Sequence, residues 1–442
     1  MNTNKSIFIA LTLLGITLPA GAADLIETYH AAQGQDSVFA AARGAQRAGQ
    51  EKLSQGRSTL LPSLTATANT TYNDVSTNNL PGAVLVNQKY NNSGYGLTLV
   101  QPLFRQNNWQ MYTESELQVA QSDAQFKNAE QDLIIRSAQA YFDVLAAQDA
   151  VNLTAAQKTA IAEQLAQAKR NFEVGSATIT DTLEAQARYD LVDAQAIAAQ
   201  SNLEIKERSY QQLTNAMPNN LQALGPAFKL EMPQPSDAEK WVENAQQGNL
   251  QLAVAKAGAE IADKEVVRNR GGHYPTIDLV ATYNKNNAGA NAGYTGAGYE
   301  TEVKTVGLQL NFPIFQGGST QSKWREAEAN RDRANAELEN ARRNVDLQTR
   351  QAYSGVVNGM SQVMALEQAL KSSEKLLEAS KLGHEVGVRT NLDVLNAQQQ
   401  LFSTRRDLYQ AKYNYLISRL KLRAATGSLA EDELMVVNQS LH

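Results

Sequence analysis

The two halves of the chain repeat each other at a shift of about 212 residues, and this duplication constrains the fold more than any other feature. Because the matching segments recur in the same order, we expect two structural repeats, residues 23–230 and 231–442. Each is predicted to hold a helix, a β-hairpin, a long helix and a return helix. The matching pairs are 61–67 with 274–280, 96–104 with 307–315, and 173–175 with 385–387.

Alternating apolar and polar residues mark two strands in each half. The segments between the paired strands, 75–93 and 286–299, are polar and rich in Gly or Asn, which is typical of hairpin loops. We therefore predict two hairpins, or four strands, in each chain. The strand segments lie around residues 64–69, 97–101, 277–284 and 306–312.

Helical periodicity dominates the rest of each half. Residues 106–172 lack Pro and Gly and carry spaced apolar residues, so we expect one helix of roughly 65 residues and about 100 Å. Residues 319–384 are its counterpart. After each Val-Gly pair a shorter helix is predicted to return, over about 181–217 and about 391–425, which makes two antiparallel coiled-coil hairpins. Pro62 and Pro275 are expected where helix gives way to strand, and Pro102 and Pro313 where strand gives way to helix.

The amino terminus is typical of a cleavable secretory signal over residues 1–22. Lys5 precedes an apolar run from Ile7 to Leu18, and small residues follow up to Ala22. The alternative, an uncleaved anchor, is disfavoured because the run is shorter than the roughly 20 residues of a spanning helix. We expect export, with the mature chain beginning at Ala23.

An exported chain of this pattern can enter a membrane only through its strands, which indicates an outer membrane. Four strands cannot close a barrel, since the smallest need about eight, so the barrel must be shared between chains. Two chains would give eight strands with a filled interior, whereas three would give twelve and a water-filled lumen. A trimer is the simplest channel. A soluble β-sandwich with helical arms is the alternative that the alternation alone leaves open.

Composition argues against catalysis and cofactors. The chain has no cysteine and a net charge of −5 with mixed signs, so neither thiolate sites nor nucleic-acid binding is indicated. No phosphate-binding loop or catalytic triad is evident. The four histidines have no spacing typical of metal ligands, and we expect no metal, no cofactor and no enzymatic activity. They are His30, His273, His384 and His442.

The order of these parts resembles the TolC family of trimeric outer-membrane efflux and type I secretion ducts, over nearly the whole mature chain. The strings that carry the resemblance are 273–279, 312–318 and 413–417. The resemblance implies a mixed α and β fold, in which a trimeric 12-stranded β-barrel continues into a long α-helical coiled-coil barrel that extends into the periplasm. It also implies a homotrimer in outer-membrane lipid, a periplasmic adaptor and an inner-membrane transporter.

In this family the tips of the helical hairpins close the periplasmic entrance and dock the adaptor. A glycine at such a tip also has a purely structural reason, because the reversal between helices requires a positive φ. Both roles can hold together. The matching tip residues are Val174, Gly175 and Thr178 in the first half, and Val386, Gly387 and Thr390 in the second.

The resemblance also implies an acidic ring and links that hold the entrance shut. Asp393 falls at the ring position, where three carboxylates would attract cations. Asn396 departs from the family pattern, which has a second aspartate there, and this predicts weaker cation selectivity. The positions of the gate links are Thr180, Asp181, His384 and Arg389, and Arg170 lies one turn before the first tip.

His384 stands where the family pattern has a tyrosine. Because imidazole gains a proton at about pH 6 to 7, mild acid is hypothesised to alter closure. Arg170 is interpreted mainly as a solvated charge.

Two other classes of function were weighed against the passive exit duct. A free-standing diffusion porin would need the barrel but not the long helices, and would have more strands per chain. A coiled-coil spacer would need the helices but not the paired strands. The sequence leaves open the cargo, and which transporter and adaptor the protein serves.

Overall fold

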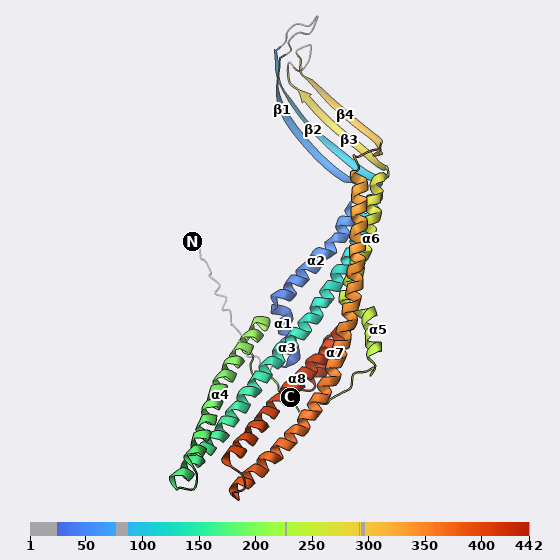
Figure 1. Cartoon of the computed structure of the whole chain (residues 1–442). Helices are drawn as coiled ribbons and strands as arrows, with labels where there is room; N and C mark the ends of the chain where they lie inside the picture. The colour runs from blue at the N-terminus through green and yellow to red at the C-terminus, as the bar shows by residue number, and fades with distance from the viewer. Residues whose placement is uncertain (1–23, 77–86, 226–227, 291, 293–296, 442) are drawn as a thin grey trace, which may run out of the picture.

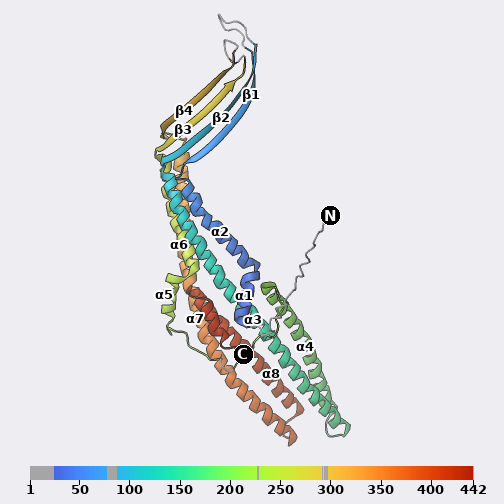
Figure 2. The same ribbon diagram turned by 180° about the vertical axis from the view of Figure 1, so that it is seen from behind.

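The computed structural model describes residues 24–76, 87–225, 228–290, 292 and 297–441. The molecule is elongated, with a β-sheet at one end and the tips of two helical hairpins at the other (Figure 1, Figure 2). The predicted signal sequence, 1–22, and the predicted start at Ala23 lie outside the described residues. The predicted mixed α and β fold is confirmed.

The elements follow one another in a similar order in the two halves, but two helices precede each hairpin where one was predicted. The first half contains α1 (Leu25–Gln35), α2 (Ser37–Ser58), β1 (Ser63–Ser76), β2 (Asn87–Phe104), α3 (Gln106–Glu173) and α4 (Ile179–Thr214). The second contains α5 (Ala238–Gly248), α6 (Leu250–Arg270), the short 3₁₀ helix η1 (Gly271–His273), β3 (Thr276–Ala288), β4 (Tyr299–Asn311), α7 (Ser319–Glu385), α8 (Asn391–Ala425) and α9 (Glu431–Asn438).

The two long helices run from the base of the sheet to the tips (Figure 1). α3 has 68 residues and α7 has 67, so each is about 100 Å long, as the spacing of apolar residues predicts. α4 returns along α3, and α8 returns along α7. Among the described residues, none of the helices is both long enough and apolar enough to cross a membrane.

The four strands form one antiparallel sheet in the order β1-β2-β3-β4, so β1 and β4 are its edges. The sheet is apolar on one side only. Leu308 and Val306 there are 70% and 77% exposed. In the register, Leu64 faces Leu99, Leu99 faces Ala281, and Ala281 faces Val306. We call this side the apolar face, made by Leu64, Ala66, Leu97, Leu99, Leu279, Ala281, Val306, Leu308 and Leu310.

The opposite side of the sheet is polar. A row of threonines crosses all four strands, since Thr65 faces Thr98, Thr98 faces Thr282, and Thr282 faces Thr305. The hydroxyl oxygens of Thr282 and Thr305 are 2.6 Å apart. Cross-strand pairs of this kind fix the register, and the alternation predicted from the sequence is confirmed for these strands.

The predicted loop limits are partly wrong. Four segments expected in loops belong to strands: 75–76 to β1, 87–93 to β2, 286–288 to β3 and 299 to β4. These residues are strand despite their mostly polar side chains, because their backbones pair with a neighbouring strand. Part of both predicted loops, 77–86 in the first and 291 with 293–296 in the second, lies outside the described residues.

The first strand-to-helix junction also differs from its prediction. Pro102 lies inside β2, at an irregularity of the pairing between Pro102 and Phe104. A proline is tolerated at such a bulge because no ladder hydrogen bond is needed from its nitrogen. Just beyond, the Arg105 guanidinium binds the Asp278 carboxylate through two bonds of 2.8 and 2.6 Å, which fixes the start of α3 against β3.

Aromatic and aliphatic side chains fill a core at mid-height of the molecule. Tyr141 and Phe142 of α3 are fully buried, and Phe142 stacks on Tyr413 of α8 with centroids 5.5 Å apart. The Tyr413 hydroxyl donates to the half-buried Asp149 carboxylate at 2.6 Å. Burial, the Asp149 charge and this hydrogen bond raise the pKa of Tyr413 above its usual range.

Two helices meet end to end in the same region. α8 ends at Ala425, and the neighbouring Asn249 caps the start of α6. Asn249 accepts a hydrogen bond from the Leu252 amide at 3.0 Å and donates to the Ala425 carbonyl at 2.9 Å. One side chain therefore satisfies a free group of each helix terminus.

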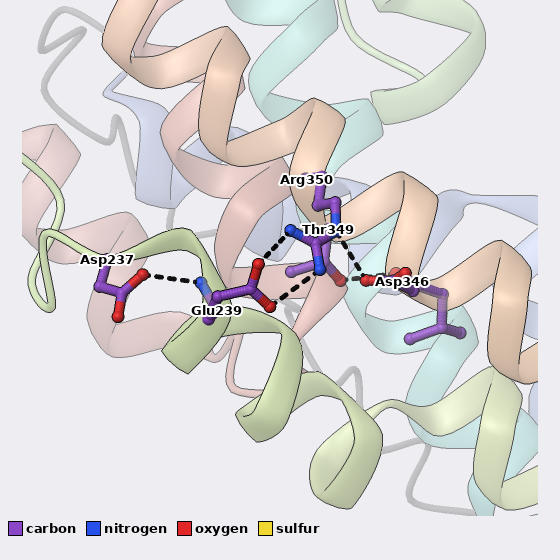
Figure 3. A network of polar contacts seen from close by, with 6 residues as sticks. Asp237, Glu239, Asp346, Thr349 and Arg350 are labelled. Carbon is purple, nitrogen blue, oxygen red and sulfur yellow. Dashed lines mark hydrogen bonds and ion pairs between the residues drawn. The ribbon is translucent and has the colours of Figure 1, made fainter.

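A polar network attaches α5 to α7 (Figure 3). Arg350 donates to both oxygens of Glu239 at 2.6 and 2.8 Å, and to Asp346 at 2.9 Å. The hydrogen bond from Arg350 lowers the pKa of Glu239. Asp237 caps α5 by accepting from the Glu239 amide at 3.0 Å. Glu239 is therefore bound through its backbone to Asp237 and through its side chain to Arg350.

Candidate functional site

The first tip is a tight reversal between α3 and α4. Gly175 has a φ of +75°, which a residue with a side chain rarely adopts. The Ser176 amide donates to the Asn171 carbonyl at 2.8 Å, which closes the end of α3. Thr178 and Asp181 then form a capping box: the Thr178 amide donates to the Asp181 carboxylate at 2.9 Å, and the Asp181 amide donates to the Thr178 hydroxyl at 3.3 Å.

The second tip repeats this geometry between α7 and α8. Gly387 has a φ of +77°, and the Val388 amide donates to the Gly383 carbonyl at 2.9 Å. Thr390 and Asp393 form the equivalent capping box, with backbone bonds of 2.9 and 3.2 Å. The sequence-predicted tip residues therefore occupy matching places in two matching turns.

Asp393, the predicted ring residue, has a structural role as well. Its carboxylate accepts from the amide and hydroxyl of Thr390, and Arg389 lies 3.7 Å away. The hydrogen bonds from Thr390, aided by the Arg389 charge, lower the pKa of Asp393. The group is thus held as an anion at the first turn of α8, where the helix dipole also favours negative charge.

His384 and Arg389 come together at the end of α7. The Nδ1 atom of His384 is 3.3 Å from the Arg389 carbonyl oxygen. Gly383 is a residue that the sequence reasoning missed: a Cβ built there would lie 2.7 Å from Cγ of Arg389. A side chain at position 383 would therefore require Arg389 to shift.

The remaining predicted gate residues are not paired with one another within this chain. Asp181 bonds Thr178, and Arg389 faces Asp393 instead. Thr180 is exposed in the first turn of α4. Val174 and Val386 are 77% and 66% exposed, so both tips present apolar side chains to the surroundings.

Asn396 makes a contact that the sequence did not predict. Its side-chain oxygen accepts a hydrogen bond of 2.8 Å from Arg188 of α4, and the same guanidinium donates to Gln399. The signal in the sequence was weak, because nothing local distinguishes Arg188 from Arg208, the other arginine on α4, and its partners lie more than 200 residues away. No group of three or more His, Cys, Asp or Glu side chains able to hold a metal ion occurs in the described part of the chain.

Comparison with known proteins confirms the resemblance. The profile of the family described as "Outer membrane efflux protein" matches residues 28–216 and again 241–428. The outer membrane protein TolC of Escherichia coli (strain K12) is 32% identical over 443 residues, covering 98% of this chain and 88% of that protein.

Two further comparisons agree with this. The alkaline protease secretion protein AprF of Pseudomonas aeruginosa is 33% identical, covering 96% of this chain and 89% of AprF. The crystal structure of the CmeC outer membrane channel of Campylobacter jejuni superimposes with a TM-score of 0.79 at 16% identity, covering 100% of this chain and 97% of that chain. The chain belongs to the outer membrane efflux protein family, and within it resembles TolC and its secretion relatives.

Proposed function

We propose that the protein is the outer-membrane exit duct of a tripartite efflux pump or a type I secretion system. It conducts drugs or proteins passively from an inner-membrane transporter and a periplasmic adaptor to the exterior. The observation that carries this proposal is the near full-length similarity to both TolC and a protease secretion protein. The fold supports it, because a sheet with one apolar face continues directly into helices of about 100 Å.

The proposed assembly is a homotrimer with a 12-stranded β-barrel in outer-membrane lipid. Each chain supplies one four-stranded sheet with two unpaired edges, and an edge left open in lipid would leave backbone groups without hydrogen bonds. The proposed repeats, 23–230 and 231–442, are supported by the two matches of one family profile to one chain. The helices would continue the barrel as a coiled-coil tube.

Closure is proposed to lie at the helical tips. Asp393 and Asn396 would ring the entrance, and Thr180, Asp181, His384 and Arg389 would link neighbouring helices. The adaptor would dock at Val174, Gly175, Thr178, Val386, Gly387 and Thr390. Two features support this: the tips are the end of the molecule farthest from the sheet (Figure 2), and their valines are exposed.

Planar-bilayer conductance of the purified protein, with its mass in detergent, tests the proposal. We expect a trimer with small cation-selective currents that grow when Arg389→Ser removes the gate link. Asp393→Asn should reduce cation selectivity, because it removes the ring charge while keeping an oxygen for the capping box. Asp181→Asn is the control for selectivity alone, since it alters the equivalent box of the first tip and a proposed gate link but leaves the ring charge in place. It should therefore not reduce cation selectivity.

Other results would change the conclusion. Large currents that none of these substitutions alters would favour a diffusion porin. A protein that stays monomeric, needs no detergent and inserts into no bilayer would contradict the proposed function altogether.

A further inference from the structure

Arg188 joins the two helical hairpins near their tips. It lies on α4, and its guanidinium donates to Asn396 at 2.8 Å and to Gln399, both on α8. The two acceptors lie three residues apart, so they are neighbours on one face of α8. The guanidinium is planar and carries several donors in a fixed arrangement, so it can bind both acceptors at once.

Few side chains connect α4 with α8 around Arg188. Leu395 of α8 is 1% exposed and packs with Ala185 and Val192 of α4. Arg188 is the one residue of α4, among the described residues, whose side chain forms hydrogen bonds with side chains of α8. No ion pair joins these two helices in the described part of the chain. Arg188 therefore supplies the side-chain hydrogen bonds between these two helices, beside an apolar cluster that contains Leu395.

Arg188 also brings positive charge close to Asp393. Asn396 follows Asp393 by three residues on α8, about one helical turn. Both partners of Arg188 are neutral amides, and no described acid forms an ion pair with it. Arg389, in contrast, faces Asp393 at 3.7 Å.

We propose that Arg188 is a positioning and selectivity-determining residue of the channel entrance. Its hydrogen bonds hold α8 against α4, so that α8, which carries Asp393, can move outward only after they break. Its charge offsets part of the attraction that three Asp393 carboxylates exert on cations. This inference rests on the proposed function, because it assumes that α8 lines the entrance.

Two substitutions separate the two effects. Arg188→Gln keeps an amide donor toward α8 but removes the charge, so cation selectivity should rise while closure changes little. Arg188→Ala removes both, so the currents should grow as well. Because the link is solvent-exposed, we expect the open-to-closed ratio to rise by roughly 5-fold for each protomer. Arg208→Ala is the matched control, since Arg208 also lies on α4 but bonds Gln211 of its own helix at 2.9 Å.

A double-mutant cycle identifies the partner on α8. If Arg188 acts through Asn396, the Arg188→Ala change should have a much smaller effect in an Asn396→Ala background. A second measurement uses the absence of cysteine from the chain. Cys residues introduced together at positions 188 and 399 should react with a short bis-maleimide, and the cross-linked trimer should conduct less than the uncross-linked one.

The outcomes distinguish this inference from the proposed function. If the wild type forms gated channels but Arg188→Ala behaves like Arg208→Ala, the inference is wrong and the proposed function stands. If Arg188→Ala lowers the currents, the link holds the open form, which also overturns the inference. If the wild type forms no channel, the proposed function and the inference fail together.

Discussion

At the scale of single residues, Glu114 is a buried carboxyl group whose charged form is disfavoured. It lies on α3 with 5% of its surface exposed, and Arg268 of α6 approaches its Oε1 atom to 3.1 Å. Glu265 contacts the same arginine at 3.4 Å. Burial raises the pKa of Glu114 to about 7, because the attraction of Arg268 is too weak to offset burial and the nearby Glu265 adds repulsion.

Glu114 should therefore make stability depend on pH. Between its ordinary value of 4.5 and about 7, folded Glu114 holds a proton that the unfolded chain has lost. Stability must then fall as the pH rises through this window, by up to about 3 kcal/mol per protomer. The urea midpoint of the full protein in detergent, measured at pH 5.5 and pH 8, should show this loss.

Glu114→Gln should remove most of that pH dependence, because its amide carries no charge at either pH. Glu116→Gln, two residues away on the exposed side of α3, is the matched control and should keep it. Equal slopes in the wild type and Glu114→Gln would contradict the assignment.

The sequence indicates local turns better than contacts between distant residues. The capping boxes of Thr178 with Asp181 and Thr390 with Asp393 span three residues each, and such a signature can be read from the sequence. Glu114 with Arg268, and Arg188 with Asn396, join residues that are far apart in the sequence. Their pairing depends on how the helices pack, which spacing does not reveal.

At the scale of the elements, the contact between α8 and α6 depends on Asn249. Its side chain is 8% exposed and bonds both helix ends. Asn249→Ala should lower the free energy of unfolding by about 1–2 kcal/mol. Hydrogen exchange of the first-turn amides of α6 should quicken in the same variant.

Asn249→Asp separates the two bonds. A carboxylate still caps α6, but it cannot donate to the Ala425 carbonyl, so this variant should protect the first turn of α6 while loosening the end of α8. If Asn249→Asp and Asn249→Ala expose both helix ends equally, the two bonds are not independent.

Helices were predicted more closely than strands. Residues 391–425 were expected as a helix and are one, and residues 106–172 fall one residue short of α3. Helical bonds are local, so composition and periodicity mark their limits. The last seven residues of the first predicted loop, 87–93, lie in β2. They are strand because they pair with distant residues: Asn91 with Tyr72 of β1, and Asn92 with Ala288 of β3. No local feature separates a polar strand from a polar loop.

At the scale of the whole molecule, the two faces of the sheet should respond differently to charge. Leu308 lies on the apolar face, and the adjacent Gln309 points to the polar side. If lipid covers the apolar face, Leu308→Lys should cost about 2–4 kcal/mol and lower the amount of protein in the outer membrane. Gln309→Lys, its neighbour and matched control, should insert normally. Equal levels of both variants in membrane fractions would contradict the proposed orientation of the sheet.

The open edges of the sheet bear on the order of events during biogenesis. Within the described part of the chain, β1 and β4 each have one side that no strand covers, and such edges are tolerated in water but not in hydrocarbon. If the proposed trimeric barrel is correct, the strands of one chain can enter lipid only once neighbouring chains cover both edges. Insertion should accordingly depend steeply on the local supply of newly exported chains, and a shortage should leave precursors in the periplasm within reach of proteases.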